Sequence, residues 1–315
     1  MPDITQQLNA AGIPYRTGVP LKTLSTWQIG GPADYVAEPR SPREIVLARQ
    51  IAIDTGTPWI PLGHGSNILF DDAGYRGLII KLGHGFKACE FQGTTVTAQA
   101  GLWVPNLARA CAARGLSGIE HTAGIPGSLG GLIYMNGGSM RRNIGDNVVS
   151  VDIIDEGGRQ LRLPSEDCGF TYRHSVFQER NAIIIGAQLR LNADTPANVR
   201  AQMLKILAER RAKFPLDHPN CGSVFSNTAD LYAAYGPPGM VIDRAGLKGT
   251  RVGDAQVSHR HANFIVNLGA ATSADVRALV RTIRAAILER TGYTLHCEVI
   301  YLPPNGAPAP LDTFL

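Results

Sequence analysis

The sequence predicts an α+β fold, and three observations lead to this prediction. Segments with strand-like and helix-like patterns are mixed along the 315 residues, without the regular alternation that builds a doubly wound parallel sheet. Two glycine-rich loops lie in the first half of the chain, at 61–69 and 124–138. Neither loop has the glycine spacing of a Rossmann fingerprint or of a P-loop. If the chain binds a nucleotide, it uses some other arrangement of loops.

The stretch 124–138 is the most informative part of the chain because it contains six glycines. Each glycine inside regular structure costs about 0.5–1 kcal/mol relative to alanine, so the run predicts a loop that turns sharply or approaches a ligand closely. The N–H groups of such a loop can converge on phosphate oxygens. Together with 61–69, the pattern favours a diphosphate bound from two sides. Two ordinary tight connections are the alternative.

Composition limits the possible classes of function. With 44% hydrophobic residues, the chain can bury one large core or two to three smaller ones. Its net charge of +4 is mild and spread along the sequence, which argues against nucleic-acid binding. The five cysteines are scattered, and the close pair His259 and His261 has no further ligand type nearby, so we expect neither disulfides nor a metal site.

We also expect a cytoplasmic protein. The first residues lack the basic region and apolar run of a signal peptide. No uninterrupted stretch of about 18 apolar residues occurs, so we expect no membrane span.

The first half combines two helices with short strands. The first helix begins at Ser41, which forms a capping box with Glu44, and it ends before Gly56. The second helix spans about 104–114 and stops at Gly115. Short strands are expected at 59–60, 78–80 and 94–98, after an amphipathic lead-in over residues 1–30.

A hairpin and a long helix mark the middle of the chain. Strands at 148–154 and 160–163 flank a glycine turn, and a buried strand follows at 182–191. A basic helix then runs from Thr195 to about Lys213. The remaining expected elements are an irregular segment at 214–239, a strand at 264–267, a helix at 273–290 closed by Gly292, a final strand at 294–302 and a peripheral Pro-rich tail at 303–315.

A series of different short motifs occurs between about residue 20 and residue 300. In the first half they lie at 26–35, 63–69, 124–131 and 136–138. In the second half they lie at 172–175, 222–227, 245–249, 257–263 and 298–299. In this order, the motifs resemble those of the UDP-N-acetylenolpyruvoylglucosamine reductase family, in its shorter subclass.

The resemblance implies a cytoplasmic flavoenzyme of peptidoglycan precursor synthesis. Such enzymes bind FAD and use NADPH to reduce UDP-N-acetylglucosamine enolpyruvate to UDP-N-acetylmuramate. The alternatives are a flavin-dependent alcohol or sugar oxidase on the same fold and an inactive relative. The implied architecture is a two-lobed FAD-binding region of the vanillyl-alcohol-oxidase type at 1–194, with lobes at about 20–75 and 76–194, then a smaller α+β substrate-binding domain at 195–302 and the tail at 303–315.

The resemblance assigns the chemistry to Arg173, Ser223 and Glu298. Ser223 matches the serine that donates a proton to the α carbon of the substrate, although a serine that stabilises the Gly222 turn is the alternative. Arg173 and Glu298 match the pair that holds and polarises the substrate carboxylate, and a guanidinium suits this role because it binds a carboxylate through two parallel hydrogen bonds. A solvent-facing residue on an edge strand is the alternative for Glu298.

The resemblance also implies ligand-binding residues. Tyr172, Lys213 and Asn227 match substrate-binding positions, although Lys213 would equally suit a helix end and Asn227 could stabilise its own turn. The chain differs from the family at Ser226 and Thr228, where Lys and Pro are usual, which puts substrate affinity in doubt. The expected cofactor-binding residues are Gly63, His64, Gly65, Ser66, Asn67, Ile68, Leu69, Gly124, Ile125, Pro126, Gly127, Ser128, Gly131 and Asn136.

Overall fold

The computed structural model describes residues 3–315, which form two compact units. Unit 1 contains the residues up to Arg16 together with Val36–His64 and Leu78–Arg210. Unit 2 contains Thr17–Tyr35, Gly65–Gly77 and Arg211–Leu315. The units are therefore discontinuous in sequence. The chain passes from one to the other within the strands β1, β2 and β5, in the loop between β3 and β4, and near the end of α5.

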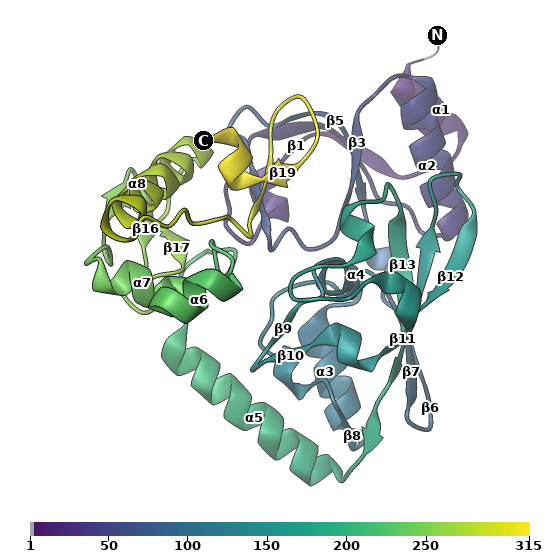
Figure 1. Cartoon of the computed structure of the whole chain (residues 1–315). Helices are drawn as coiled ribbons and strands as arrows, with labels where there is room; N and C mark the ends of the chain where they lie inside the picture. The colour runs from purple at the N-terminus through teal and green to yellow at the C-terminus, as the bar shows by residue number, and fades with distance from the viewer. Residues whose placement is uncertain (1–2) are drawn as a thin grey trace. The chain divides into compact units, whose positions relative to one another are not determined.

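Helices and strands are mixed along the chain, as Figure 1 shows. The α-helices are α1 (Ile4–Ala10), α2 (Pro42–Asp54), α3 (Val104–Ala112), α4 (Leu129–Tyr134), α5 (Pro196–Lys213), α6 (Ala229–Tyr235), α7 (Pro238–Arg244) and α8 (Ser273–Thr291). The strands are β1 (Tyr15–Pro20), β2 (Pro32–Ala37), β3 (Trp59–Leu62), β4 (Ile68–Phe70), β5 (Tyr75–Lys81), β6 (Cys89–Gln92), β7 (Thr95–Gln99), β8 (Leu116–Ser117), β9 (Gly138–Ser139), β10 (Arg142–Asn143), β11 (Val148–Ile154), β12 (Gln160–Pro164), β13 (Ile183–Arg190), β14 (Asn192–Ala193), β15 (Arg251–Val252), β16 (Ala255–Val257), β17 (Ile265–Asn267), β18 (Ile300–Leu302) and β19 (Ala309–Pro310).

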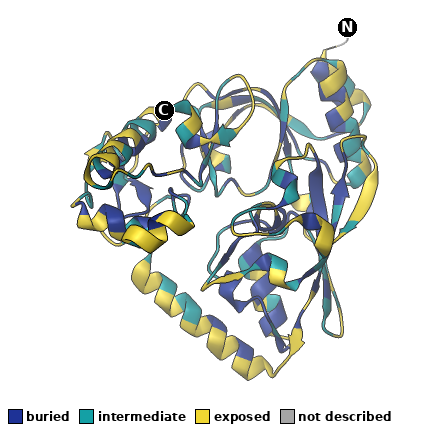
Figure 2. Cartoon of the chain, viewed as in Figure 1, coloured by how far each residue is buried: buried dark blue, intermediate teal, exposed yellow. Residues whose placement is uncertain are grey.

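Unit 1 is organised around a five-stranded antiparallel sheet with the order β12-β11-β13-β7-β6. Side chains alternate across this sheet. Val96 and Ala98 of β7 are buried in a core shared with α3 and α4, and Figure 2 shows α3 as mostly buried. On the opposite face, Asp152 of β11 pairs with Arg162 of β12 at 2.7 Å. In a separate sheet, β3 pairs with β5 in parallel, and Ile60 lies opposite Ile79.

The helix ends follow the signals in the sequence. At the start of α2, the Ser41 side chain accepts a hydrogen bond from Glu44 N at 3.3 Å. At the start of α8, Thr272 and Asp275 form a capping box, and Gly292 ends this helix in the left-handed conformation. The predicted helices at 41–56 and 273–290 are therefore confirmed.

Unit 2 has its core between α8 and two small sheets. The sheet β15-β16-β17 buries Val257 against α8, which contributes Ile283 to the same core. In the other sheet, with the order β19-β18-β4, β18 and β4 are parallel and Tyr301 lies opposite Leu69. The buried indole of Trp27 donates a hydrogen bond to Ile265 O at 2.9 Å, which ties the motif at 26–35 to this core.

The glycine-rich stretch at 124–138 contains a helix, α4, where the sequence predicted a loop. Gly130 and Gly131 both lie inside α4. A Cβ on Gly130 would lie 2.9 Å from the Cβ of Ala100, so this glycine lets the helix approach the end of β7 closely. The prediction was wrong because close packing, and not only turning, can favour glycine.

Three further expectations are corrected. The segment 214–239 is not all irregular, because α6 and α7 lie in it or begin in it, and Pro238 occupies the first turn of α7. The final strand is limited to β18, since residues before it bond to a loop instead of a sheet. The tail at 303–315 is not peripheral, because Leu311 is buried in the unit 2 core and its N–H donates to Val299 O at 2.9 Å.

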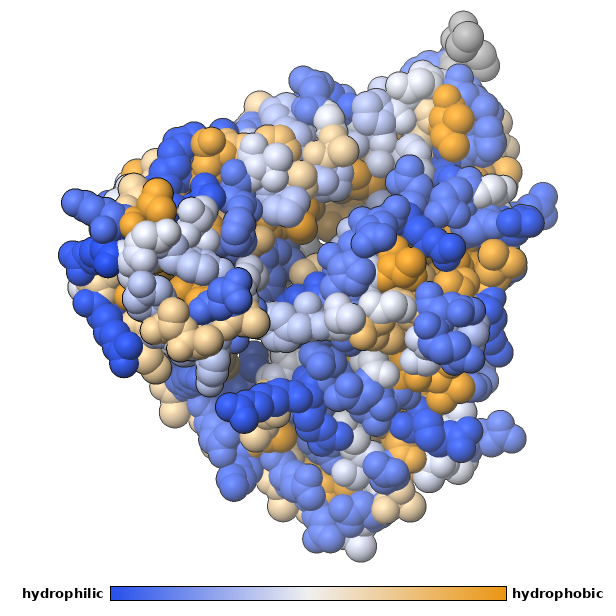
Figure 3. Space-filling view, viewed as in Figure 1, coloured by the Kyte–Doolittle hydropathy of each residue, from blue (hydrophilic) through white to orange (hydrophobic). Residues whose placement is uncertain are grey.

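The units divide the chain differently from the predicted domains, because residues 17–35 and 65–77 belong to unit 2. The boundaries at 194/195 and 302/303, and the lobes at 20–75 and 76–194, stay predictions. Within residues 3–315, no helix is long and apolar enough to cross a membrane. Figure 3 shows a face that is mostly hydrophilic, with apolar residues in separate areas.

Truncating the α8 face that builds the unit 2 core should destabilise the protein. Ile283 is fully buried, so Ile283→Ala should lower the free energy of unfolding by about 2–5 kcal/mol. Leu288 lies on the same helix but is 49% exposed, so Leu288→Ala should change it by no more than about 0.5 kcal/mol. Urea unfolding followed by circular dichroism measures both, and equal losses would contradict this packing.

Candidate active site

The two predicted glycine-rich loops meet within unit 1. A Cβ on Gly63 would lie 2.2 Å from Ser128 Oγ, so the first loop passes directly over the second. Ser128 is also bridged to Trp103 in an antiparallel pairing. The Lys81 ammonium donates a hydrogen bond to Gly63 O. Unit 1 therefore brings together the loops that the sequence singled out, at Gly63 and Ser128.

The second loop is anchored by its own backbone. Gly127 O accepts from Val104 N at 2.9 Å, and Leu129 N donates to Leu102 O at 2.9 Å. At the start of the loop, Arg210 Nε donates to Gly124 O at 3.1 Å. Burial lowers the pKa of this guanidinium, which still remains charged at any working pH. The loop is thus preformed, with α5 covering its beginning.

His64 lies in the first loop and packs against Trp103, with ring centroids 4.2 Å apart. Burial, together with the charges of Lys81 and Lys87, lowers the pKa of His64 to about 4. Burial also lowers the pKa of Lys81 to about 8. At neutral pH, His64 is therefore neutral, while Lys81 is mainly charged.

Asn136 uses its side chain to hold the segment that precedes Arg173. Its Nδ2 donates to Thr171 O at 2.7 Å, and its Oδ1 accepts from Gly145 N at 3.0 Å. Because both polar atoms are used in this way, we propose that Asn136 supports the site instead of binding the cofactor through its amide.

Arg173 itself has a left-handed backbone, with φ of 56°. This conformation costs a non-glycine residue of the order of 1–3 kcal/mol and is often found at functional sites. The Arg173 guanidinium donates to Gly138 O at 3.2 Å and lies over the ring of Tyr172, 5.2 Å from its centroid. Tyr172 is 54% exposed.

In unit 2, the loop that begins at Ser223 lies directly beside Glu298. Glu298 N donates to Val224 O at 2.8 Å, and Ser226 N donates to His296 O at 2.9 Å. The loop after Ser223 and the segment that contains Glu298, far apart in sequence, are thus joined by main-chain hydrogen bonds. Lys213 and Asn227 also belong to unit 2, whereas Arg173 and Tyr172 belong to unit 1.

Asn67 connects the first glycine-rich loop to Glu298. Its Nδ2 donates to Glu298 O at 3.1 Å, and its main-chain O accepts from Ile300 N at 3.1 Å. The next predicted residues have packing roles as well, because Leu69 is fully buried in the unit 2 core. The sequence singled out this loop as cofactor-binding, which stays a prediction, and it did not indicate that Asn67 bonds to a predicted catalytic segment.

The two residues that differ from the family pattern are both anchored. Ser226 Oγ donates to His296 O at 3.2 Å. Thr228, the N-cap residue of α6, is hydrogen-bonded through Oγ1 to Tyr293 OH at 2.5 Å. This contact restrains the loop where a proline would otherwise stiffen it. Asn227, between them, has a buried Oδ1 with no hydrogen-bond partner among residues 3–315.

Comparison with known proteins identifies the family. A family model described as an FAD binding domain matches residues 33–164, and one for the C-terminal domain of UDP-N-acetylenolpyruvoylglucosamine reductase matches residues 214–302. The curated protein named UDP-N-acetylenolpyruvoylglucosamine reductase 1 from Corynebacterium glutamicum is 44% identical over 292 residues, which cover 93% of this chain and 87% of the relative. The chain belongs to the UDP-N-acetylenolpyruvoylglucosamine reductase family.

Other comparisons agree with this family. The relative from Heliobacterium modesticaldum is 40% identical, over 91% of this chain and 90% of its own length. The crystal structure of the reductase from Thermus caldophilus has a TM-score of 0.78 and 30% identity, and the match covers 92% of this chain and 99% of that one. The predicted family and the α+β fold with an FAD-binding domain are confirmed.

The residues of this family member fit FAD at a buried hydroxyl in unit 2. In unit 1, the contact of Gly63 with Ser128 leaves no room for a Cβ on the first loop, so this glycine lets the two glycine-rich loops pack closely. In unit 2, Thr26 N donates to Gly65 O at 3.1 Å, and the buried Thr26 Oγ1 has no hydrogen-bond partner within residues 3–315. An oriented hydroxyl of this kind suits a phosphate oxygen.

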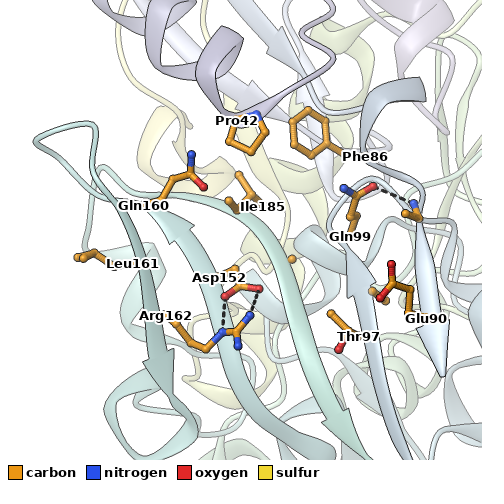
Figure 4. A pocket seen from close by; sticks show the side chains of 13 residues that line it. Pro42, Phe86, Glu90, Thr97, Gln99, Asp152, Gln160, Leu161, Arg162 and Ile185 are labelled. Carbon is orange, nitrogen blue, oxygen red and sulfur yellow. Dashed lines mark hydrogen bonds and ion pairs between the residues drawn. The ribbon is translucent and has the colours of Figure 1, made fainter. Parts of the chain in front are cut away.

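A cavity of about 560 Å³ lies elsewhere in unit 1, on the face of the five-stranded sheet opposite the core. Figure 4 shows Asp152 and Arg162 paired on its floor, with contacts of 2.7 and 3.1 Å. Pro42 and Phe86 cover one end. Among the described residues that line it, none was assigned to the cofactor, the substrate or the chemistry.

His121, just before the second glycine-rich loop, is a buried histidine of the reductase. It is 1% exposed, and its Nδ1 accepts from Ser139 N at 3.4 Å. Burial lowers the pKa of His121 to about 4, and the Arg142 charge acts in the same direction. The imidazole is therefore neutral at pH 7, with its proton on Nε2.

This burial predicts a loss of stability in acid. The pKa of His121 is lower in the folded protein than its ordinary value of about 6.5. Its contribution to the stability of the folded protein is therefore fully present above pH 6.5 and is lost as the pH falls towards 4. His121→Phe should reduce the fall in melting temperature over this range. His259→Phe, which removes an exposed histidine, should leave the pH dependence unchanged. Identical pH profiles for wild type and His121→Phe would contradict the prediction.

Proposed function

We propose that this chain reduces UDP-N-acetylglucosamine enolpyruvate to UDP-N-acetylmuramate, with FAD bound and NADPH as the reductant, as a step of peptidoglycan precursor synthesis in the cytoplasm. The observation that carries the proposal is the hydrogen bond from Glu298 N to Val224 O, which joins the residue after Ser223 to Glu298 in a chain of this family. Its relatives are named as reductases, which supports this reaction over an alcohol or sugar oxidase.

The reaction needs a hydride at the β carbon of the enolpyruvyl group and a proton at its α carbon. When bound, FAD supplies the hydride that NADPH has delivered. Arrival of the hydride moves negative charge towards the substrate carboxylate. The chain must therefore bind this carboxylate, stabilise the added charge and deliver one proton.

We assign the charge stabilisation to Arg173, with Glu298 helping to hold and polarise the substrate carboxylate. The Arg173 guanidinium stays charged at any working pH and can bind a carboxylate through two hydrogen bonds. A preorganised cation at a developing negative charge contributes about 3–4 kcal/mol or more to the rate. Its left-handed backbone and the support from Asn136 through Thr171 favour such preorganisation.

We assign the proton to Ser223. A serine hydroxyl is a weak acid, so it can act here only because the acceptor is an enolate carbon and because the loop holds it in place. The bonds of Val224 and Ser226 to the 296–298 segment provide that support. We assign binding of the UDP-sugar to Asn227, Lys213 and Tyr172. The buried Oδ1 of Asn227 has no hydrogen-bond partner among residues 3–315.

Absorption spectroscopy under anaerobic conditions tests the proposed reaction. The purified protein, reconstituted with FAD, should be yellow, should bleach when NADPH is added, and should regain its colour only when the enolpyruvyl UDP-sugar follows. Formation of UDP-N-acetylmuramate is checked by mass spectrometry. A protein that cannot be reconstituted with FAD, or one that bleaches but is not reoxidised by the sugar, would contradict the proposal.

Replacing the proton donor should separate the two half-reactions. Ser223→Ala should leave flavin reduction by NADPH intact, and it should slow reoxidation by the sugar by about 10²–10⁴-fold, the usual contribution of a positioned acid. Ser226→Ala removes a hydroxyl three residues away that bonds to His296 O, and it should keep both rates close to wild type. Equal losses in both half-reactions of Ser223→Ala would overturn its assigned role.

A further inference from the structure

Asn263 holds the residue after Val224 with both polar atoms of its side chain. Its Oδ1 accepts from Phe225 N at 2.9 Å, and its Nδ2 donates to Phe225 O at 2.9 Å. Its main-chain O also accepts from Val224 N at 2.9 Å. Asn263 is only 6% exposed, so water does not compete freely for these bonds.

The opposite side of the same loop bonds to the segment that contains Glu298. Val224 O accepts from Glu298 N at 2.8 Å, and Ser226 N donates to His296 O at 2.9 Å. Every main-chain polar group of Val224 and Phe225 is therefore paired, some with Asn263 and the rest with Glu298. The loop after Ser223 is clamped between two segments and cannot shift without breaking several bonds.

We propose that Asn263 is a positioning residue for Ser223. It acts by fixing the backbone of Val224 and Phe225, and through them the place from which the Ser223 hydroxyl delivers its proton. The inference rests on the proposed role of Ser223.

Only a carboxamide of this length fits the task. The clamp needs one donor and one acceptor at the end of a short side chain, and asparagine offers both. Asn263→Asp keeps the shape but replaces the donor by a second acceptor oxygen, which then faces Phe225 O. The loop should move away from that oxygen and carry Ser223 with it.

Asn267 provides a matched control. It is 2% exposed, its Nδ2 donates to Trp27 O at 3.0 Å, and its Oδ1 accepts from Gly269 N at 2.8 Å and Ala271 N at 3.0 Å. It is thus as buried and as fully bonded as Asn263, yet its side chain bonds to none of residues 223–226. Asn267→Asp should destabilise the protein to a similar extent without disturbing the Ser223 loop.

The test compares the FAD-loaded wild type, Asn263→Asp and Asn267→Asp by anaerobic rapid mixing and by thermal melting. Both variants should melt at lower temperature, and both should be reduced by NADPH at nearly the wild-type rate. At saturating sugar, Asn263→Asp alone should reoxidise about 100-fold more slowly, since a displacement of about 1 Å can cost that much. Replacing H₂O by D₂O should also slow the reoxidation of Asn263→Asp by a larger factor than it slows that of the wild type, because proton delivery limits the rate more in the variant.

Three results separate the possible failures. If Asn263→Asp reoxidises at the wild-type rate, or if both variants slow equally, the positioning role is overturned. If the wild type itself is not reoxidised by the sugar, the proposed function fails instead. If Asn263→Asp does not fold, Asn263→Ser takes its place, because its hydroxyl can still pair with one polar group of Phe225, and the same pattern of rates is expected.

Discussion

The arrangement of unit 2 depends on one set of hydrogen bonds made by the main chain of residues 298–300. Glu298 N bonds to the loop after Ser223, while Glu298 O and Ile300 N bond to Asn67 in the first glycine-rich loop. Parallel pairing of β4 with β18 continues the contact. A short stretch of chain thus bonds to the proposed flavin-binding loop on one side and to the loop of the proposed proton donor on the other.

In unit 1, close packing of loops and side-chain hydrogen bonds hold the predicted site residues. Its glycine-rich loops are pressed together at Gly63 and Ser128, and its proposed carboxylate-binding residue, Arg173, has a left-handed backbone. Such strain persists only where the surroundings compensate, and here Asn136 holds Thr171 while Gly138 O accepts from the guanidinium. His121, which is 1% exposed and accepts from Ser139 N, is buried in the same unit.

The sequence predicted those features that depend on neighbouring residues. The Ser41 N-cap of α2 and the glycine that ends α8 are local signals, and each was correct in position. Contacts between distant residues were not predictable in the same way. The Asn67–Glu298 bond joins positions 231 apart, and Asn263 pairs with a residue 38 positions away. For the same reason, residues 294–299 were predicted as part of a strand, although Cys297 pairs with a loop residue, Phe225. The assignments of Arg173, Ser223 and Glu298 came from the resemblance, and their catalytic roles stay predictions.

Native-state hydrogen exchange would test most directly whether the Ser223 loop is clamped in this way. The amides of Val224, Phe225, Ser226 and Glu298 should exchange slowly and with a common opening free energy, because they share one network of hydrogen bonds. The amides of α8 report on the unit 2 core in the same experiment. If residues 224–226 exchange at the rate of an exposed loop while α8 stays protected, the loop after Ser223 is not clamped.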